Sequence, residues 1–280
     1  MHHIIQHIRN ELSPLYSPSE IRTLTHMLLE QVTGLSAADI IAGKLNDLSY
    51  DNSVKIEEMI QRLKKSEPIQ YILGEAHFYN RTFKVTPDVL IPRPETEELI
   101  EWIVQDARGT TPQLFDIGTG SGCIAITLAK ELPGATVHAC DISAPALTVA
   151  QHNAQDNDAP VAFRQQDILT NKTSSTQYDI IVSNPPYIAQ SEEQDMHNNV
   201  LDYEPHLALF IPDSDPLLFY RHIATFAAQH LSPDGTLYFE INTYNGAETV
   251  ELLQQQGFRN VTLRNDLSGN PRMIKANKPL

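Results

Sequence analysis

QLFDIGTGSGCIAITLAKEL, residues 113 to 132, decides the fold of this chain. Its first part is an apolar run that ends in a series of alternating glycines, and its second part is an apolar stretch long enough for a helix. The pattern predicts a buried strand, a tight glycine turn and a helix, in that order. A strand followed by a helix is half of a βα unit, the building block of a parallel sheet.

The same alternation continues from this stretch to the C-terminus. Strands are predicted in ATVHACD, PVAFRQQD, YDIIVS and GTLYFEIN, helices in SAPALTVAQHNAQ, DPLLFYRHIATFAAQHL and GAETVELLQQQG, and a final strand pair in NVTLRND and PRMIKA. Repeated βα units imply an α/β fold with a doubly wound, mostly parallel sheet and right-handed crossovers. Such sheets bind ligands at the carboxyl ends of their strands, near the point where the strand order reverses.

The N-terminal part of the chain has a different pattern. Apolar residues at helical spacing in 17–35, 36–45 and 53–65 predict a small helical bundle. The segment 69–86 has β-branched and aromatic residues around Gly74, which predicts a β-hairpin or an extended connector. We therefore expect three parts: a helical domain, 1–70, a β-hairpin linker, 71–90, and an α/β domain, 91–280.

The composition restricts the class of protein. The formal net charge of −15 and the pI near 5.1 argue against binding nucleic acid through the general surface field. The two cysteines, Cys123 and Cys140, have neither CxxC spacing nor a nearby histidine cluster, so no metal site is predicted. Reduced cysteines, and the absence of any apolar run of signal-peptide or membrane-span length, predict a cytoplasmic protein with no membrane association.

The glycines after the first predicted strand have the spacing G-x-G-x-G. A dinucleotide-binding turn would have a glycine at position 123, where this chain has Cys123. The pattern therefore favours a turn that wraps the amino-acid part of a nucleoside ligand such as S-adenosylmethionine, with tight strand–helix packing as the alternative. The candidate cofactor-binding residues of this turn are Asp116, Gly118, Thr119, Gly120, Ser121 and Gly122.

Acidic residues follow the next two predicted strands. Asp141 lies about twenty residues beyond the glycines, where a carboxylate commonly accepts hydrogen bonds from ribose hydroxyls. It could instead cap the following helix, although Ser143 is better placed for that role. Asp167 could accept a hydrogen bond from an adenine amine and Ile168 could pack on the ring, but Asp167 could equally be a surface acid.

The fourth predicted strand ends in Asn184-Pro185-Pro186-Tyr187. The Asn184 side chain offers a carbonyl acceptor, and a proline leaves its own carbonyl free while fixing the backbone. Asn184 and Pro185 would together present two fixed acceptors to the two hydrogens of a planar NH₂ group. Tyr187 could stack on that group and present its π face to a cation. The motif therefore predicts a clamp for a planar amine or amide nitrogen, unless it is a proline-rich loop with an incidental asparagine.

DIGTGSG, CDIS and SNPPY at these spacings resemble class I S-adenosylmethionine-dependent methyltransferases that act on planar nitrogens. PIQYILGEAHFYNRTFKVTPDVLIPRPETEELIE, YEPHLALF and DLSGNPRMIKA narrow the resemblance to the release factor glutamine methyltransferase family. IPRPETE, residues 91–97, is the most specific of these segments. The chain departs from the family pattern at Asn242 and Asn245, where we expect glycine and glutamine, and at Ile168, where some members carry an aromatic residue.

The resemblance implies a seven-stranded sheet and S-adenosylmethionine-dependent N5-methylation of the glutamine in the Gly-Gly-Gln motif of class I peptide chain release factors. S-adenosylhomocysteine would be the product, and the helical domain would dock the release factor. Asn184, Pro185 and Tyr187 would be catalytic, Pro186 would join them in binding the substrate, and Asn184 would also contact the cofactor. No direct binding of nucleic acid is expected.

Three other functions fit parts of the sequence. An adenine-N6 methyltransferase acting on DNA or RNA would use the same clamp on a flipped base, but the acidic charge and the lack of a target-recognition domain oppose it. A nicotinamide-dependent oxidoreductase would leave the Asn-Pro-Pro-Tyr motif unexplained. A non-catalytic adaptor would have no need of an intact clamp.

Overall fold

A computed structural model describes residues 2–45, 47–170 and 175–280. The chain divides into two compact units, Met1–Gly74 with His197–Tyr203, and Glu75–Met196 with Glu204–Leu280. We call them the helical unit and the sheet unit. A short internal segment thus belongs to the helical unit although it lies within the second half of the sequence. The three-part division expected from the sequence stays a prediction.

The helical unit is built from capped amphipathic helices. Its helices are α1 (His2–Leu12), α2 (Pro18–Thr33), α3 (Ala37–Ile41), α4 (Tyr50–Leu63), α5 (Ile69–Leu73) and α9 (Asn198–Leu201). Ser17, Ser36 and Ser49 cap α2, α3 and α4 by accepting a backbone N–H, which satisfies a donor at each helix start. The core of the unit is aliphatic and includes Ile8, Leu12, Leu28, Leu29, Ile56, Ile60 and Leu63.

The segment around Gly74 differs from the expectation. Gly74 ends α5 in a left-handed conformation (φ 78°), and its N–H donates to the Gln70 carbonyl. The hairpin of β1 (Glu75–Phe78) and β2 (Arg81–Lys84) turns instead at Tyr79 and Asn80, both with positive φ. Two positive φ angles match the twist of a two-residue hairpin, but Tyr-Asn is an unusual sequence for that turn.

The sheet unit contains the predicted seven-stranded, mostly parallel sheet. Its strands are β3 (Gln113–Ile117), β4 (Thr136–Asp141), β5 (Val161–Gln165), β6 (Tyr178–Ser183), β9 (Leu231–Glu240), β10 (Arg259–Asn265) and β11 (Pro271–Asn277). The order is β10-β11-β9-β6-β3-β4-β5, in which only β10 and β11 pair antiparallel to their neighbours. The order reverses between β3 and β6, which makes this the switch point of the sheet.

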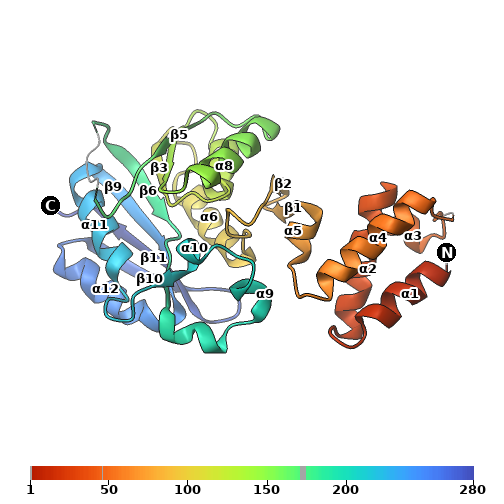
Figure 1. The fold of residues 1–280 in the computed structure, drawn as a ribbon. Helices are drawn as coiled ribbons and strands as arrows, with labels where there is room; N and C mark the ends of the chain where they lie inside the picture. The colour runs from red at the N-terminus through yellow and green to blue at the C-terminus, as the bar shows by residue number, and fades with distance from the viewer. Residues whose placement is uncertain (1, 46, 171–174) are drawn as a thin grey trace. The chain divides into compact units, whose positions relative to one another are not determined.

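Helices cover both faces of this sheet, as Figure 1 shows. They are α6 (Pro94–Asp106), α7 (Cys123–Glu131) and α8 (Ala144–Asp156) on one face, and α11 (Leu218–His230) and α12 (Gly246–Gln255) on the other. Adjacent strand residues therefore enter different cores: Leu114 packs with α6 and α7, and Phe115 packs with α11 and stacks on Tyr178. Strands buried on both faces are apolar throughout, which explains the runs in the sequence.

The chain between β6 and α11 is built from short elements. They are β7 (Ile188–Ala189), the 3₁₀ helix η1 (Gln190–Asp195), α9, α10 (His206–Leu209) and β8 (Phe210–Ile211), and a second 3₁₀ helix, η2 (Thr243–Asn245), precedes α12. Their lengths of two to six residues are too short for a periodic signal, so the sequence predicted none of them. Among the described helices, none has the length and apolar character that a membrane crossing needs.

Candidate functional site

The glycine turn and the Asn-Pro-Pro-Tyr motif lie side by side at the switch point. β3 and β6 are parallel neighbours, and their paired residues Ile117 and Ser183 are the last of each strand. Gly118 and Asn184 therefore leave the sheet next to each other. The Ser183 hydroxyl donates to the Ile117 carbonyl at 2.6 Å, which ties the two strand ends together.

A cavity of about 330 Å³ opens at these strand ends. All of its lining residues belong to the sheet unit. The lining includes ten residues that the sequence singled out: Gly118, Thr119, Gly120, Ser121, Asp141, Asp167, Ile168, Asn184, Pro185 and Pro186. Asp116, Gly122 and Tyr187 are not among the residues that line the cavity, although all three lie in the segments that form it.

The glycine turn presents open backbone to the cavity. Gly118 and Gly120 have φ of 75° and 53°, and a Cβ on either would meet no atom within 4 Å. The Gly118 and Thr119 N–H groups donate to the Cys140 carbonyl at 2.9 Å, which fixes the turn against β4. Glycine is needed here for its backbone conformation, and the absent side chains leave room for a ligand to approach the backbone.

Gly122 and Asp116 stabilise the turn by packing and hydrogen bonding, on its side away from the cavity. Gly122 has φ of 82°, and a Cβ there would lie 2.9 Å from Ile126 Cδ1 and 3.2 Å from Ala150 Cβ. The fully buried Asp116 accepts a 2.6 Å hydrogen bond from the Thr119 hydroxyl. Burial raises the pKa of Asp116 to about 7, although the Thr119 hydrogen bond lowers it in part. Both residues thus hold the shape of the turn and do not face the cavity.

Asp141 joins the turn to the cavity wall. Its Oδ2 accepts from the Gly120 N–H and its Oδ1 from the Ser143 N–H, both at 2.9 Å. Ser143, as expected, is the residue that caps α8, since its hydroxyl accepts from the Ala146 N–H. A carboxylate has about four acceptor positions, so Asp141 keeps capacity to accept from a ligand. Burial raises the pKa of Asp141 above its ordinary range.

Asp167 and Ile168 form the part of the wall that follows β5. Asp167 accepts from the Leu169 N–H at 2.9 Å and from the Thr170 hydroxyl at 3.0 Å, so much of its capacity serves the local turn. Ile168 is buried, at 6% exposure, and lines the cavity. The aliphatic side chain of Ile168 is thus better placed to contact a ligand than Asp167 is to hydrogen-bond one.

The Asn184 side chain contacts Thr96, which in turn contacts Glu240, and neither of these residues was predicted from the sequence. Its Nδ2 donates to the Thr96 hydroxyl oxygen at 3.4 Å, and the Thr96 hydroxyl donates to Glu240 Oε2 at 2.6 Å. Thr96 comes from the start of α6 and Glu240 from the end of β9. Burial raises the pKa of Glu240, and its hydrogen bond to Thr96 and the charge of Arg272 oppose that shift.

Tyr187 points away from the cavity. Its hydroxyl donates to Glu240 Oε1 at 3.3 Å, and its ring packs against the core beneath α11 and α12. Burial raises the pKa of Tyr187, so the phenol is neutral. The predicted stacking of Tyr187 on a substrate stays a prediction, but the observed contacts give this residue a supporting position.

Two of the segments that carried the resemblance meet beside the cavity. Arg93 of IPRPETE donates to Glu204 Oε1 of YEPHLALF at 2.6 Å, and the Ile91 N–H donates to Glu204 Oε2 at 3.2 Å. Glu204 has a side-chain exposure of 1%, so its charge depends on these partners. Arg93 lines the cavity together with Pro205 and Leu207, so this ion pair fixes part of the cavity wall.

Comparison with known proteins identifies the family. The family model "Methyltransferase small domain" matches residues 95–203, and the model "PrmC N-terminal domain" matches residues 3–74. The release factor glutamine methyltransferase of Flavobacterium psychrophilum is 47% identical over 272 residues, which cover 95% of each chain. That of Bacteroides thetaiotaomicron is 47% identical over 282 residues, covering 99% of this chain and all of the relative. This chain belongs to the release factor glutamine methyltransferase family.

A solved structure shares the fold of this glutamine methyltransferase family member. The T. Thermophilus 16S rRNA N2 G1207 methyltransferase RsmC, in complex with AdoMet and guanosine, has a TM-score of 0.52 at 19% identity. The alignment covers 73% of this chain and 49% of that protein. At this identity the likeness concerns the fold alone.

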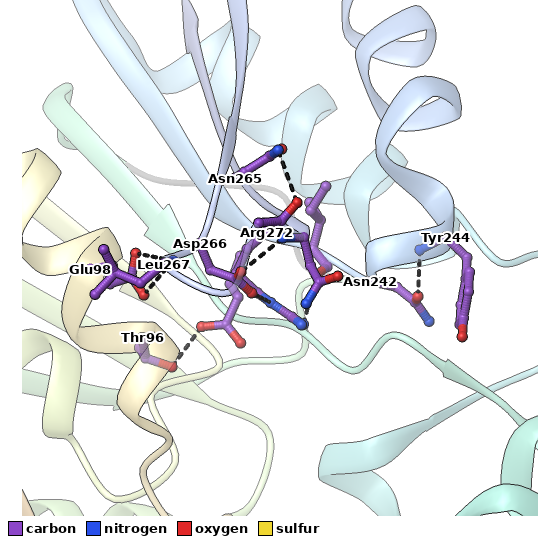
Figure 2. Close-up of polar contacts among 12 residues, drawn as sticks. Thr96, Glu98, Asn242, Tyr244, Asn265, Asp266, Leu267 and Arg272 are labelled. Atoms are coloured by element: carbon purple, nitrogen blue, oxygen red, sulfur yellow. Dashed lines mark hydrogen bonds and ion pairs between the residues drawn. The ribbon is translucent and has the colours of Figure 1, made fainter.

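The segment that departs from the glutamine methyltransferase pattern has a structural role in this chain. Asn242 Oδ1 accepts from the Tyr244 N–H, and its Nδ2 donates to the Tyr187 carbonyl at 3.0 Å. Asn242 therefore connects η2 to the Asn-Pro-Pro-Tyr loop, a contact that glycine could not make. Figure 2 shows Asn242 and Tyr244 with their hydrogen bond.

The third resemblance segment, DLSGNPRMIKA, is tied to the same region. Asp266 accepts from Arg272 Nε at 3.2 Å, and the Leu267 N–H donates to the carboxylate of Glu98 on α6. Figure 2 shows these contacts on one side of Thr96. The β10–β11 hairpin is thus fastened to the helix that carries Thr96.

Thr96 and Glu240 had signals in the sequence that could have identified them. Thr96 lies within the specific IPRPETE segment, and Glu240 ends the fifth parallel strand. The rule that functional groups follow strand ends applies to Glu240 as it does to Asp141. Among the described residues no cluster of three metal-binding side chains occurs, and burial raises the pKa of both Cys123 and Cys140 to about 12, so their thiols are unreactive.

Proposed function

We propose that this chain transfers a methyl group from S-adenosylmethionine to the side-chain nitrogen, N5, of the glutamine in the Gly-Gly-Gln motif of class I peptide chain release factors. The observation that carries the proposal is the position of Asn184 and Pro185 beside the glycine turn, in one cavity. Relatives that are 47% identical over nearly the whole chain are named for this activity. The adenine-N6 alternative has no observation of its own in its favour.

The cavity fits S-adenosylmethionine in size and in the types of donors and acceptors. Its volume of about 330 Å³ is at the lower end of the range for small-molecule sites. The open backbone at Gly118 and Gly120 would receive the amino-acid part, Asp141 would accept from the ribose hydroxyls, and Ile168 would pack on the adenine. When bound, S-adenosylmethionine supplies a methyl group on a sulfonium, which is activated for in-line displacement.

Asn184 and Pro185 would hold the glutamine amide in the reactive orientation. With Nδ2 donating to Thr96, the Asn184 Oδ1 is left to accept from a ligand in the cavity. The Pro185 carbonyl is the second acceptor, and Pro186 makes its position rigid. Two acceptors for the two N–H bonds of one amide fix both the plane and the rotation of the substrate nitrogen.

This arrangement addresses the weakness of an amide as a nucleophile. The amide lone pair is delocalised into the carbonyl, so nitrogen attacks poorly. Accepting both N–H bonds increases electron density on nitrogen, and orientation alone can provide several kcal/mol of the barrier reduction, up to about 7–11 in well-aligned systems. Methyl transfer would release a neutral thioether and leave a positive charge on the nitrogen, which would then lose one N–H proton to solvent. No deprotonation of the amide is required before methyl transfer, and we assign no general base.

The release factor is the proposed partner, and the helical unit is the proposed docking platform. The helical unit exposes apolar side chains, among them Ile41 at 74% and Tyr50 at 82%. We place the enzyme in the cytoplasm, since Cys123 and Cys140 are both free and buried. Binding to nucleic acid is not part of the proposal, because the net charge is −15.

One transfer assay tests the proposal. The protein is incubated with methyl-labelled S-adenosylmethionine and, in separate reactions, a purified class I release factor, the same factor with the Gly-Gly-Gln glutamine changed to alanine, and duplex DNA. We expect label in the unmodified factor alone, at the glutamine by peptide mass spectrometry. Label that enters the DNA, or enters both forms of the factor equally, would refute the proposed function.

A further inference from the structure

The clamp at Asn184 works in only one of two orientations of its side-chain amide. With Oδ1 toward the substrate, Asn184 accepts an N–H of the glutamine amide. With the amide rotated by half a turn, the Nδ2 hydrogens would face the substrate's N–H bonds, and donor would meet donor. The two orientations have nearly the same shape, so packing cannot distinguish them. Only a hydrogen-bonding partner that can accept but not donate, or donate but not accept, selects one of them.

Thr96 can only accept a hydrogen bond from Asn184, which selects one orientation. A threonine hydroxyl has one hydrogen, and Thr96 donates it to Glu240 Oε2 at 2.6 Å. The Thr96 oxygen can then only accept in the direction of Asn184, where Nδ2 lies at 3.4 Å. The Asn184 carbonyl oxygen in that place would face another acceptor, which is repulsive.

Glu240 gives Thr96 its direction. The Glu240 side chain is nearly inaccessible to solvent, with residue exposure of 1%. Its two oxygens accept from Thr96 and from the Tyr187 hydroxyl. Burial raises the pKa of Glu240, while the hydrogen bond from Thr96 and the charge of Arg272 lower it in part. Because Glu240 Oε2 accepts from the Thr96 hydroxyl at 2.6 Å, the single hydrogen of that hydroxyl is directed to Glu240.

We propose that Thr96 and Glu240 are positioning residues that fix the amide of Asn184 with its carbonyl oxygen toward the substrate. The chain of contacts runs from Glu240 through Thr96 to Asn184, and it involves α6, β9 and the end of β6. Neither residue reacts. This inference rests on the proposed function, because the clamp matters only if the substrate is a planar N–H donor.

The test removes the Thr96 hydroxyl without changing the shape of the side chain. Thr96→Val should lower the single-turnover rate of release factor methylation about 10-fold, the factor that corresponds to one lost hydrogen bond. The dissociation constant for S-adenosylmethionine and the KM for the release factor should stay within about two-fold of wild type. Thr96→Ser restores the hydroxyl and should restore the rate.

A matched control is available in α7. Thr127 is fully buried, and its hydroxyl has no hydrogen-bond partner in the described structure. Thr127→Val should therefore leave the methylation rate unchanged. Should Thr96→Val lose S-adenosylmethionine binding altogether, Thr96→Ala provides the second variant without a hydroxyl, with the same expected fall.

The possible results distinguish failure of the proposed function from failure of the positioning role of Thr96 and Glu240. If wild-type protein does not methylate the release factor, the proposed function fails, and this inference fails with it. If wild type is active and Thr96→Val is equally fast, only the positioning role is refuted. A Thr96→Ser rate as low as that of Thr96→Val, with wild-type cofactor affinity, also refutes it, because the shape of the side chain and not its hydroxyl would then matter.

Discussion

Asp116 illustrates how one buried side chain can make the stability of this protein depend on pH. The residue is completely buried, and burial is the main reason that its pKa rises from 3.8 to about 7. The folded protein therefore retains a proton that the unfolded chain releases near pH 4. Between pH 4 and pH 7 the folded state binds more protons, so this residue's contribution to stability falls as the pH rises.

Replacing Asp116 with asparagine should remove this pH dependence. In the wild-type protein, Asp116 should lower the free energy of unfolding by at most about 1.4 kcal/mol for each pH unit between pH 4 and pH 7. We expect Asp116→Asn to show a flatter profile, whatever its absolute stability. Urea unfolding at half-unit steps from pH 4.5 to 7.5 measures the difference in slope, and equal slopes for the two proteins would contradict the assignment.

The turn between β3 and α7 contains glycines that serve different purposes. Gly118 and Gly120 face open space and line the cavity, whereas Gly122 faces Ile126 and Ala150. All have positive φ, so alanine costs about 1–2 kcal/mol of backbone strain at each. At Gly122 the added methyl group also overlaps its neighbours, which adds roughly 1–3 kcal/mol.

Alanine substitutions should therefore separate ligand binding from folding. Gly118→Ala should weaken S-adenosylmethionine binding at least about ten-fold with a modest loss of stability, because its methyl group occupies the cavity. Gly122→Ala should lose more stability than Gly118→Ala. Calorimetric binding and thermal unfolding of both variants check this. The opposite order, with Gly122→Ala the more stable variant, would show that Gly122 is not packed as described.

The regular elements of the sheet unit could be predicted from sequence, and the short ones could not. The apolar runs of β3, β6 and β9 follow from burial on both faces, which leaves a signal in the residues themselves. The hairpin turn at Tyr79–Asn80 could not be placed, because those residues are not typical of a tight turn. Gly74 looked like a turn residue, but it ends α5, and five residues of helix give no periodic signal.

The same distinction applies to the candidate site. Asp141, Asn184 and the glycines were predictable because each directly follows a strand whose position the sequence indicates. The hydrogen bonds from Asn184 to Thr96 and from Thr96 to Glu240 join residues 88 and 144 positions apart, and no local pattern indicates such contacts. The orientation of Tyr187 toward Glu240 was missed for the same reason.

For the whole molecule, the two units have separate cores, and the cavity lies in one of them. Every residue that lines the cavity belongs to the sheet unit, while α1 to α4 form a separate aliphatic core. The formal net charge of −15 gives the molecule no general attraction for nucleic acid. The proposed function accordingly assigns cofactor binding to the sheet unit and release factor docking to the helical unit.

Hydrogen exchange should reveal this division. Adding S-adenosylmethionine at 100 times its dissociation constant should stabilise the bound form by about 2.7 kcal/mol. We expect slower amide exchange in residues 118–122, 141–143 and 166–169, and little change in α1 to α4. Protection that appears mainly in α1 to α4 would place the cofactor outside the cavity described here.

The central claim is that Asn184 holds the nitrogen that receives the methyl group. The most direct test is the single-turnover rate of release factor methylation by Asn184→Ala, at saturating S-adenosylmethionine so that any loss of cofactor affinity is removed from the comparison. We predict a fall of at least about 100-fold, as expected for the loss of a preorganised group that acts on the reacting atoms. A variant that binds the cofactor and methylates the glutamine at the wild-type rate would contradict the account.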